Sequence, residues 1–155
     1  MNISYKSPGT LEETRFEKIH SVIFNDSKNA SLKVAEEIAD LIKKKQKQNK
    51  NCVLGLATGS SPISVYQELV RMHNEDDLSF KNVITFNLDE YFPMDKDDIN
   101  SYHHFMSIHL FDHIDINKKN IHIPNGSILT EKINEYCAIY EKQIVDAGGL
   151  DFQLL

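Results

Sequence analysis

The chain has 155 residues, of which 41% are hydrophobic and 26% charged, a balance typical of one soluble globular domain with its own core. The formal net charge is −6 without a basic stripe, which argues against nucleic acid as a partner, because phosphate backbones are held by clustered Lys and Arg. The two cysteines are far apart, so we expect free thiols. The sequence has neither an apolar signal region at its start nor a membrane-spanning run. We therefore expect a cytoplasmic protein without a membrane partner.

The beginning of the chain is polar, and we expect residues 1–17 to form an N-terminal tail or arm. The β-branched and aromatic run at residues 20–24 predicts a short strand. Residues 25–27 then supply N-cap chemistry for a helix with apolar residues at helical spacing. A basic run at residues 43–50 ends this helix, complements its negative terminus and is expected to face water.

Residues 52–57 form a continuous apolar run, which predicts a parallel strand buried on both faces. A second helix follows, with Ser61 suited to its N-cap and Pro62 to its first position. Further along, the sequence predicts strands at residues 82–87 and 120–123, helices at about 101–111 and 131–146, and a last apolar run at 150–155. This alternation predicts an α/β fold, a Rossmann-like open parallel sheet flanked by helices on both sides.

The apolar run that ends at Leu155 is typical of a chain cut inside a longer protein. We therefore expect residues 18–155 to be the N-terminal portion of a single α/β domain.

The segment Thr58-Gly59-Ser60-Ser61 lies between a predicted buried strand and a helix start. Amide groups at a helix N-terminus lack partners and carry partial positive charge, so they favour an anion such as phosphate. Gly59 permits a close backbone approach, and the neighbouring hydroxyls are available as donors. The pattern is neither a Walker A loop nor a dinucleotide fingerprint, and the alternative is a simple turn with a good helix cap.

Asp89 and Glu90 directly follow another predicted strand, whose carboxyl end adjoins the first loop. A carboxylate there is suited to move a proton between carbons next to a carbonyl, provided that partial burial tunes its pKa. Adjacent residues on extended backbone point in opposite directions, so only one of the pair is expected to face a substrate. The alternative is an acidic surface turn.

These segments together resemble the glucosamine-6-phosphate deaminase family. Residues 54–62 (LGLATGSSP) are similar to its phosphate loop, and residues 80–91 (FKNVITFNLDEY) are similar to its strand and catalytic-base loop. The pairs Ser101-Tyr102 and Phe105-Met106, then residues 111–116 and the turn at 120–126, continue the match in order. The resemblance covers roughly residues 19–155.

The resemblance implies conversion of glucosamine 6-phosphate and water to fructose 6-phosphate and ammonia, without a cofactor or metal. Asp89 is implied as the base that moves a proton from C2 to C1, with Glu90 supporting its loop. Thr58, Gly59, Ser60 and Ser61 are implied as the phosphate ligands. A homo-oligomer is a further implication. The family's ring-opening histidine and the basic phosphate ligands lie beyond the strand that corresponds to residues 150–155, so these 155 residues alone are expected to be inactive or nearly so.

Two other readings remain open: a 6-phosphogluconolactonase-like hydrolase and a non-enzymatic sugar-phosphate sensor. The short N-terminal tail disfavours a sensor with a DNA-binding helix-turn-helix. Metal binding is disfavoured as well. His109 and His113 are four apart without the acidic residue of a zinc-protease motif, and the acidic segment at 95–98 lacks the glycine of an EF-hand loop.

Overall fold

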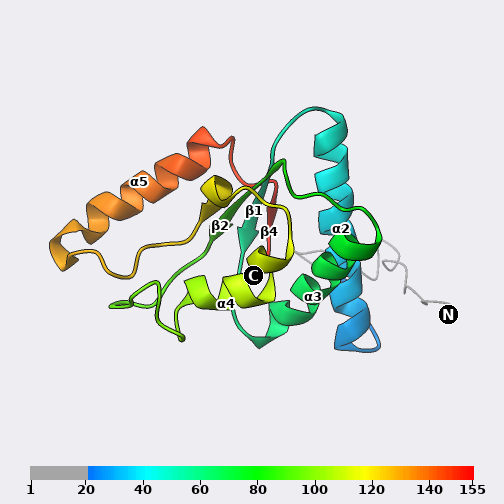
Figure 1. The fold of residues 1–155 in the computed structure, drawn as a ribbon, viewed down its shortest axis with the longest axis horizontal. Helices are drawn as coiled ribbons and strands as arrows, with labels where there is room; N and C mark the ends of the chain where they lie inside the picture. Colours follow the sequence, from blue (N-terminus) through cyan, green and yellow to red (C-terminus); the bar gives the residue numbers. More distant parts are fainter. Residues whose placement is uncertain (1–20) are drawn as a thin grey trace, which may run out of the picture.

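Four parallel strands form the sheet in this computed structural model, which describes residues 21–155. They are β1 (Cys52–Leu56), β2 (Val83–Asn87), β3 (Ile121–His122) and β4 (Phe152–Gln153), in the order β3-β2-β1-β4. Every pairing is parallel, and β1 and β2 form the two central strands (Figure 1). The fold is therefore the Rossmann-like open α/β sheet that the sequence predicts.

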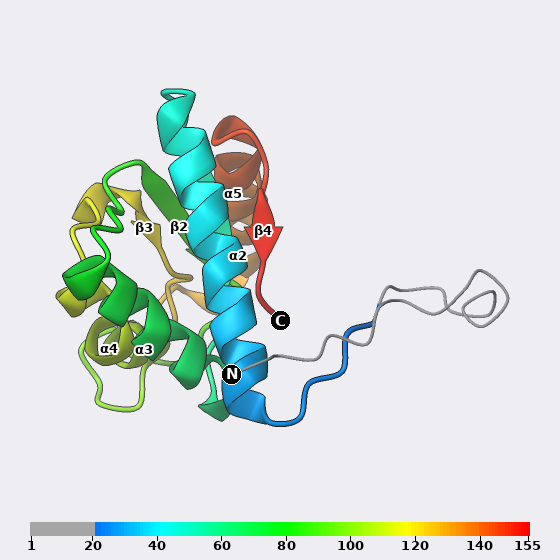
Figure 2. The same cartoon turned by 90° about the vertical axis from the view of Figure 1, so that its right-hand side faces the viewer.

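Helices cover both faces of this sheet. They are α2 (Ser27–Lys47), α3 (Ser60–Glu75), α4 (Tyr102–His109) and α5 (Ile133–Asp146), with short 3₁₀ turns at Phe111–His113, Lys118–Asn120 and Thr130–Lys132. Helices α2 and α3 pack together on one face, whereas α5 lies on the other (Figures 1 and 2). Helix α4 lies beside α3, near the carboxyl ends of the strands (Figure 1).

The core lies between the sheet and the layer of α2 and α3. Every residue of β1 is buried, as expected for a central parallel strand. The largest fully buried side chains of this layer include Ile38, Leu54, Tyr66 and Leu69. Helix α5 has no buried residue and meets the sheet through aromatic contacts, among them Tyr140 against Phe86 at 5.7 Å between ring centroids.

The strand predicted at residues 20–24 is wrong for its described part. Residues 21–24 do not form a strand, and Ile23 is 82% exposed. A β-prone run becomes a strand only when it joins a sheet, and the sheet of the described residues consists of four other segments. His20 and the tail predicted at residues 1–17 lie outside the described residues.

The start of α3 also differs from the prediction. Gly59, not Ser61, is the N-cap, and Pro62 is the third helical residue instead of the first. Gly59 has a φ of 113°, which glycine adopts without steric cost, so the chain turns into the helix earlier. The N-cap predicted within residues 25–27 is confirmed and is Asp26, whose carboxylate accepts a hydrogen bond of 2.8 Å from Asn29 N.

The basic run ends α2 as predicted, but not all of it faces water. Lys45 pairs with Asp151 at 2.5 Å, and Asp151 also accepts a hydrogen bond from Val53 N, which links α2, β1 and the turn before β4. Both cysteines are free, Cys52 buried and Cys137 exposed. Among the helices of the described residues, none has the length and apolar character that crossing a membrane requires.

Candidate functional site

The two predicted site loops leave the sheet at the same rim. Leu56 and Asn87, the last residues of β1 and β2, lie opposite each other in the parallel register. Leu88 N donates a hydrogen bond of 3.1 Å to Leu56 O just beyond that pair. The 58–61 loop and the 88–91 loop therefore start next to each other at the carboxyl ends of central strands, where open α/β sheets bind ligands.

The 58–61 loop presents the start of α3 to solvent. Gly59, Ser60 and Ser61 are exposed and Thr58 is half-buried. Gly59 contributes no side-chain cap, and the first turn of α3 contains no acidic residue. The first amide groups of this 16-residue helix therefore keep their capacity for an anion.

Asp89 and Glu90 occupy different environments, as their opposite backbone orientations predict. Asp89 is exposed at the rim. The Glu90 side chain is only 1% exposed, and its carboxylate accepts hydrogen bonds from Tyr91 N and Tyr102 N, both at 2.9 Å, and from His103 N at 3.2 Å. Its Oε2 also lies 3.0 Å from His103 Nδ1.

These contacts hold the Glu90 carboxylate in its ionised form. Burial alone raises the pKa of this carboxyl, but the hydrogen bonds from Tyr102 N, the His103 ring, Tyr91 N and His103 N outweigh burial and lower it. A carboxylate that is ionised at neutral pH and bound by these protein groups is suited to anchor the 88–91 loop to the start of α4. Of the two acids, Asp89 is thus the one whose carboxylate is available to a substrate.

Tyr102, the first residue of α4, lies beside the 88–91 loop, because its backbone N–H donates to the Glu90 carboxylate. Its ring contacts that of Tyr91, with centroids 4.6 Å apart. The pKa of its phenol is raised by hydrogen bonding to the Tyr91 side chain and by partial burial, lowered by a hydrogen bond with the Thr58 side chain, and raised again by the charge of Asp89. Tyr91 is therefore the residue of the 88–91 loop that packs directly against this phenol ring.

Sequence reasoning missed Tyr102 as a site residue. The Ser101-Tyr102 pair was part of the family resemblance, and this was the one signal that could have identified it.

Asn87, at the end of β2, carries a buried amide at the base of the rim. The residue is 2% exposed, and neither its Nδ2 nor its Oδ1 has a hydrogen-bond partner in the described part of the chain. Thr85 Oγ1, two residues earlier on the same strand face, is likewise buried without a partner. An unsatisfied buried polar group costs about 1–3 kcal/mol, so a polar group bound here would be stabilised.

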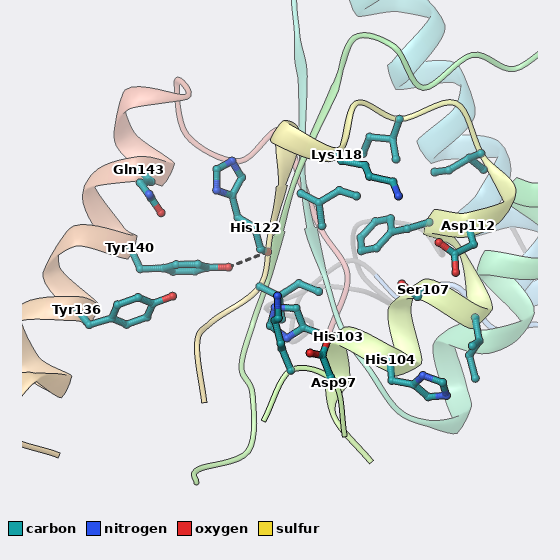
Figure 3. Close-up of a pocket in the computed structure, with 17 residues that line it drawn as sticks. Asp97, His103, His104, Ser107, Asp112, Lys118, His122, Tyr136, Tyr140 and Gln143 are labelled. Atoms are coloured by element: carbon teal, nitrogen blue, oxygen red, sulfur yellow. Dashed lines mark hydrogen bonds between the residues drawn. The ribbon is translucent and has the colours of Figure 1, made fainter. Parts of the chain in front are cut away.

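A separate cavity of about 1020 Å³ lies beside the edge strand β3, between α4 and α5. None of the six predicted site residues lines it. Figure 3 shows Tyr136, Tyr140 and Gln143 of α5 on one side and Ser107 and Asp112 on the other, with the Tyr140 hydroxyl donating to His122 O at 3.1 Å. This cavity is distinct from the rim where the two loops meet.

The histidines within residues 21–155 do not gather into a metal centre. The part of the chain that the structure describes contains no group of three His, Cys, Asp or Glu residues arranged to hold a metal ion. His109 ends α4, whereas His113 belongs to the following 3₁₀ turn, so the two do not share a helix face. In the acidic segment, Asp95 and Asp98 accept hydrogen bonds from Asp97 N and Asn100 N and so close local turns.

The protein is an open parallel α/β protein in which two polar loops follow the carboxyl ends of the central strands. The chain belongs to the family described as glucosamine-6-phosphate isomerases/6-phosphogluconolactonase, whose model matches residues 25–155. The names of both enzymes in that description refer to sugar phosphates.

Individual relatives are similar over most of this chain. A glucosamine-6-phosphate deaminase from Thermoanaerobacter sp. (strain X514) is 47% identical over 122 residues, which cover 79% of this chain and 47% of that protein. The solved structure of a monomeric glucosamine-6-phosphate deaminase superposes with a TM-score of 0.77 and 40% identity, covering 84% of this chain and 52% of that chain. The Thermotoga maritima 6-phosphogluconolactonase structure reaches a TM-score of 0.63 at 22% identity, which shows a shared fold.

The chain thus spans about half the length of these relatives, and 21% of a longer deaminase-like protein from Bacteroides thetaiotaomicron.

Proposed function

We propose that this chain supplies the phosphate-binding loop and the proton-transfer base of a glucosamine-6-phosphate deaminase. The observation that carries the proposal is the common rim: the 58–61 loop and Asp89 follow two adjacent parallel strands in register. A hexose phosphate bridges such a rim, with its phosphate at the start of α3 and its reacting carbons near the carboxylate.

Each proposed ligand has a chemical task. The amides of Gly59, Ser60 and Ser61, with the Thr58 hydroxyl, hold the phosphate. The Asp89 carboxylate takes the proton from C2 of the open-chain sugar and returns it to C1, which is general base and then general acid catalysis. Glu90 fixes the loop that carries Asp89. The reaction releases ammonia and consumes water, so the enzyme is an isomerase and deaminase that is also a hydrolase in the broad sense.

Similarity favours the deaminase over the lactonase. The deaminase relatives are 40–47% identical to this chain, whereas the lactonase structure is 22% identical. Asp89 itself also fits the deaminase better, because a base beside C2 is required for isomerisation.

Ammonia release from glucosamine 6-phosphate by the complete protein that contains these residues tests the proposal. We expect steady release without added metal or cofactor, together with fructose 6-phosphate as product. Hydrolysis of 6-phosphogluconolactone is measured in parallel. Lactone hydrolysis without ammonia release would reverse the assignment, and binding of the sugar phosphate without either reaction would favour a sensor.

The remaining half of the relatives' length is proposed to complete the site. We expect residues 1–155 alone to release ammonia at least about a hundredfold more slowly than the complete protein, because ring opening and part of the phosphate grip need further groups. Equal turnover by the two polypeptides would refute this. A cytoplasmic location and a homo-oligomer belong to the same proposal. Fractionation and sedimentation of the complete protein test them.

A further inference from the structure

The two oxygens of the buried Glu90 carboxylate have different partners. Oε1 accepts hydrogen bonds from Tyr91 N and Tyr102 N, both at 2.9 Å, and so joins the 88–91 loop to the start of α4. In the described part of the chain, the donors to Oε2 both belong to His103: the backbone N at 3.2 Å and the ring Nδ1 at 3.0 Å. The first oxygen therefore makes the link between loop and helix, and the second depends on one residue.

The His103 ring makes the shorter of the two bonds to Oε2. The Glu90 side chain is 1% exposed, so water contributes little to this oxygen. Hydrogen bonds from N–H to oxygen are about 2.7–3.2 Å long, and the backbone bond is at the long end of that range. Without the ring, a buried charged oxygen would keep only this long bond, and the carboxylate would turn about its last torsion, which has a broad energy well. That rotation would take Oε1 away from Tyr91 N and Tyr102 N.

The contacts of Glu90 also decide where the His103 ring carries its proton. Three backbone N–H groups donate to this carboxylate, so it acts as an acceptor. A neutral imidazole carries one hydrogen, on either Nδ1 or Nε2. Because Nδ1 faces the acceptor at 3.0 Å, Nδ1 is the nitrogen that donates. The ring is thus held in one tautomer and one orientation.

We propose that His103 is a positioning residue: its Nδ1–H holds the Glu90 carboxylate in the orientation that joins the 88–91 loop to α4, and so keeps Asp89 in place. The inference rests on the proposed function for its consequence, since the placement of Asp89 matters when its carboxylate moves a proton. Small errors in the placement of a catalytic group reduce turnover strongly, so a fixed carboxylate behind the base favours the reaction.

His104 is the matched control for His103. The two residues are neighbours on α4, both are half-buried, and both line the cavity beside β3 (Figure 3). The backbone N of His104 donates to Ser101 Oγ at 3.0 Å and so belongs to the helix cap. Within residues 21–155, no hydrogen bond joins its ring to the 88–91 loop. A substitution of His104 therefore changes the same surface without changing the contact with Glu90.

NMR of the histidine ring nitrogens tests the hydrogen bond in the complete wild-type protein. Long-range proton–nitrogen correlations at neutral pH show which nitrogen carries the hydrogen, and the His103 signals are identified by their loss in His103→Asn. We expect His103 Nδ1 to be protonated. A ring with an unprotonated Nδ1 would overturn the inference. This measurement needs no active enzyme, and it decides the hydrogen bond even if a substitution prevents folding.

Amide hydrogen exchange in the same protein tests the effect on the loop. The informative amides are those of Tyr91 and Tyr102, because they donate to Glu90 Oε1. We expect His103→Leu to speed their exchange about tenfold or more. His103→Asn should stay within about threefold of wild type, because its side-chain N–H takes the place of the imidazole Nδ1–H. Wild-type exchange at both amides in His103→Leu would contradict the proposed anchoring.

Turnover of glucosamine 6-phosphate is measured on the same variants. We expect His103→Leu to lower kcat about tenfold with a change in KM below about threefold, because the base is displaced and the phosphate loop is not. His103→Asn should restore kcat to within about threefold of wild type, and His104→Leu should have wild-type kcat.

The outcomes separate the inference from the proposed function. Faster exchange with wild-type kcat in His103→Leu would reduce the hydrogen bond to a structural contact and overturn its role in positioning. A protonated Nδ1 and faster exchange, with no ammonia release by the wild-type protein, would support the anchoring of the loop and refute the deaminase proposal.

Discussion

Glu90 is the residue in which structure and chemistry are most tightly linked at this site. It neighbours the proposed base, yet its carboxylate is fully used by three backbone N–H groups and a histidine ring. A carboxylate at the first turn of a helix also interacts favourably with the helix dipole. The pair Asp89-Glu90 thus divides its work: one carboxylate is exposed and available, and the other holds the loop.

We predict that Glu90→Gln lowers the free energy of unfolding by about 1–3 kcal/mol at neutral pH, because the buried side chain loses its charge-assisted hydrogen bonds. Urea unfolding measures this. Glu37→Gln is the control, since its side chain is 54% exposed and its pairing with Lys33 at 3.7 Å contributes little. An equal loss in both variants would contradict the role assigned to Glu90.

The Glu90 carboxyl also makes folding stability depend on pH. The folded-state pKa of Glu90 lies below its ordinary value of 4.5, so the ionised form contributes stability that is complete above that value. The contribution is lost as the pH falls through the lower folded pKa. We expect the stability difference between wild type and Glu90→Gln to shrink between about pH 5 and pH 3. A stability difference between the two proteins that stays constant over this pH range would contradict the role of the Glu90 charge.

At the scale of elements, the two glycines Gly59 and Gly148 allow a matched comparison. Both have positive φ values, 113° and 101°, and an added Cβ meets nothing within 4 Å at either. Substitution by Ala should therefore cost a similar backbone strain of about 1–3 kcal/mol at each. Only Gly59→Ala should lower turnover, because its methyl group lies where the phosphate approaches. Equal turnover of the two variants would exclude a ligand at the start of α3.

Gly126 packs against the backbone of the segment that follows Asp89. A Cβ at this position would collide with the backbone oxygen of Tyr91, and Met94 N donates to Gly126 O at 2.8 Å. We predict that Gly126→Ala displaces the 88–91 loop, costs about 1–3 kcal/mol and lowers turnover. Ser127→Ala is the control: it removes a hydrogen bond to Met94 O without adding atoms and should cost about 1 kcal/mol with little loss of turnover. Undisturbed turnover in Gly126→Ala would argue against this support.

Local sequence was sufficient for most elements and insufficient for a few. The apolar run at residues 52–57 predicts β1, because a central strand is buried on both faces. Residues 21–24 have similar local character but do not join the sheet, and sequence alone does not show which segments pair. The start of α3 depends on the left-handed backbone of Gly59, which a cap rule based on serine does not capture.

At the candidate site, the sequence predicts where the two loops leave the sheet, whereas the roles of their residues stay predictions. The ends of strands located the 58–61 loop and Asp89, since parallel strands end at one rim. The anchoring of Glu90 by residues 12 and 13 positions later depends on tertiary contacts that no local pattern contains.

At the scale of the whole molecule, we propose that the chain provides one side of a site. Its rim contains amides, hydroxyls and a carboxylate, and the 58–61 loop itself carries no cationic side chain for the phosphate. The relatives are about twice as long as the segments they share with this chain. This division explains why we place phosphate binding and proton transfer here and ring opening in the other half.

Exchange of the C2 proton of glucosamine 6-phosphate with solvent deuterium, followed by NMR in the complete protein, tests the central claim most directly. We predict that Asp89→Asn slows this exchange by about a hundredfold or more while the sugar phosphate still binds. Asp112→Asn, an exposed acid away from the rim, should exchange as the wild type does. Exchange at the wild-type rate in Asp89→Asn would contradict the account.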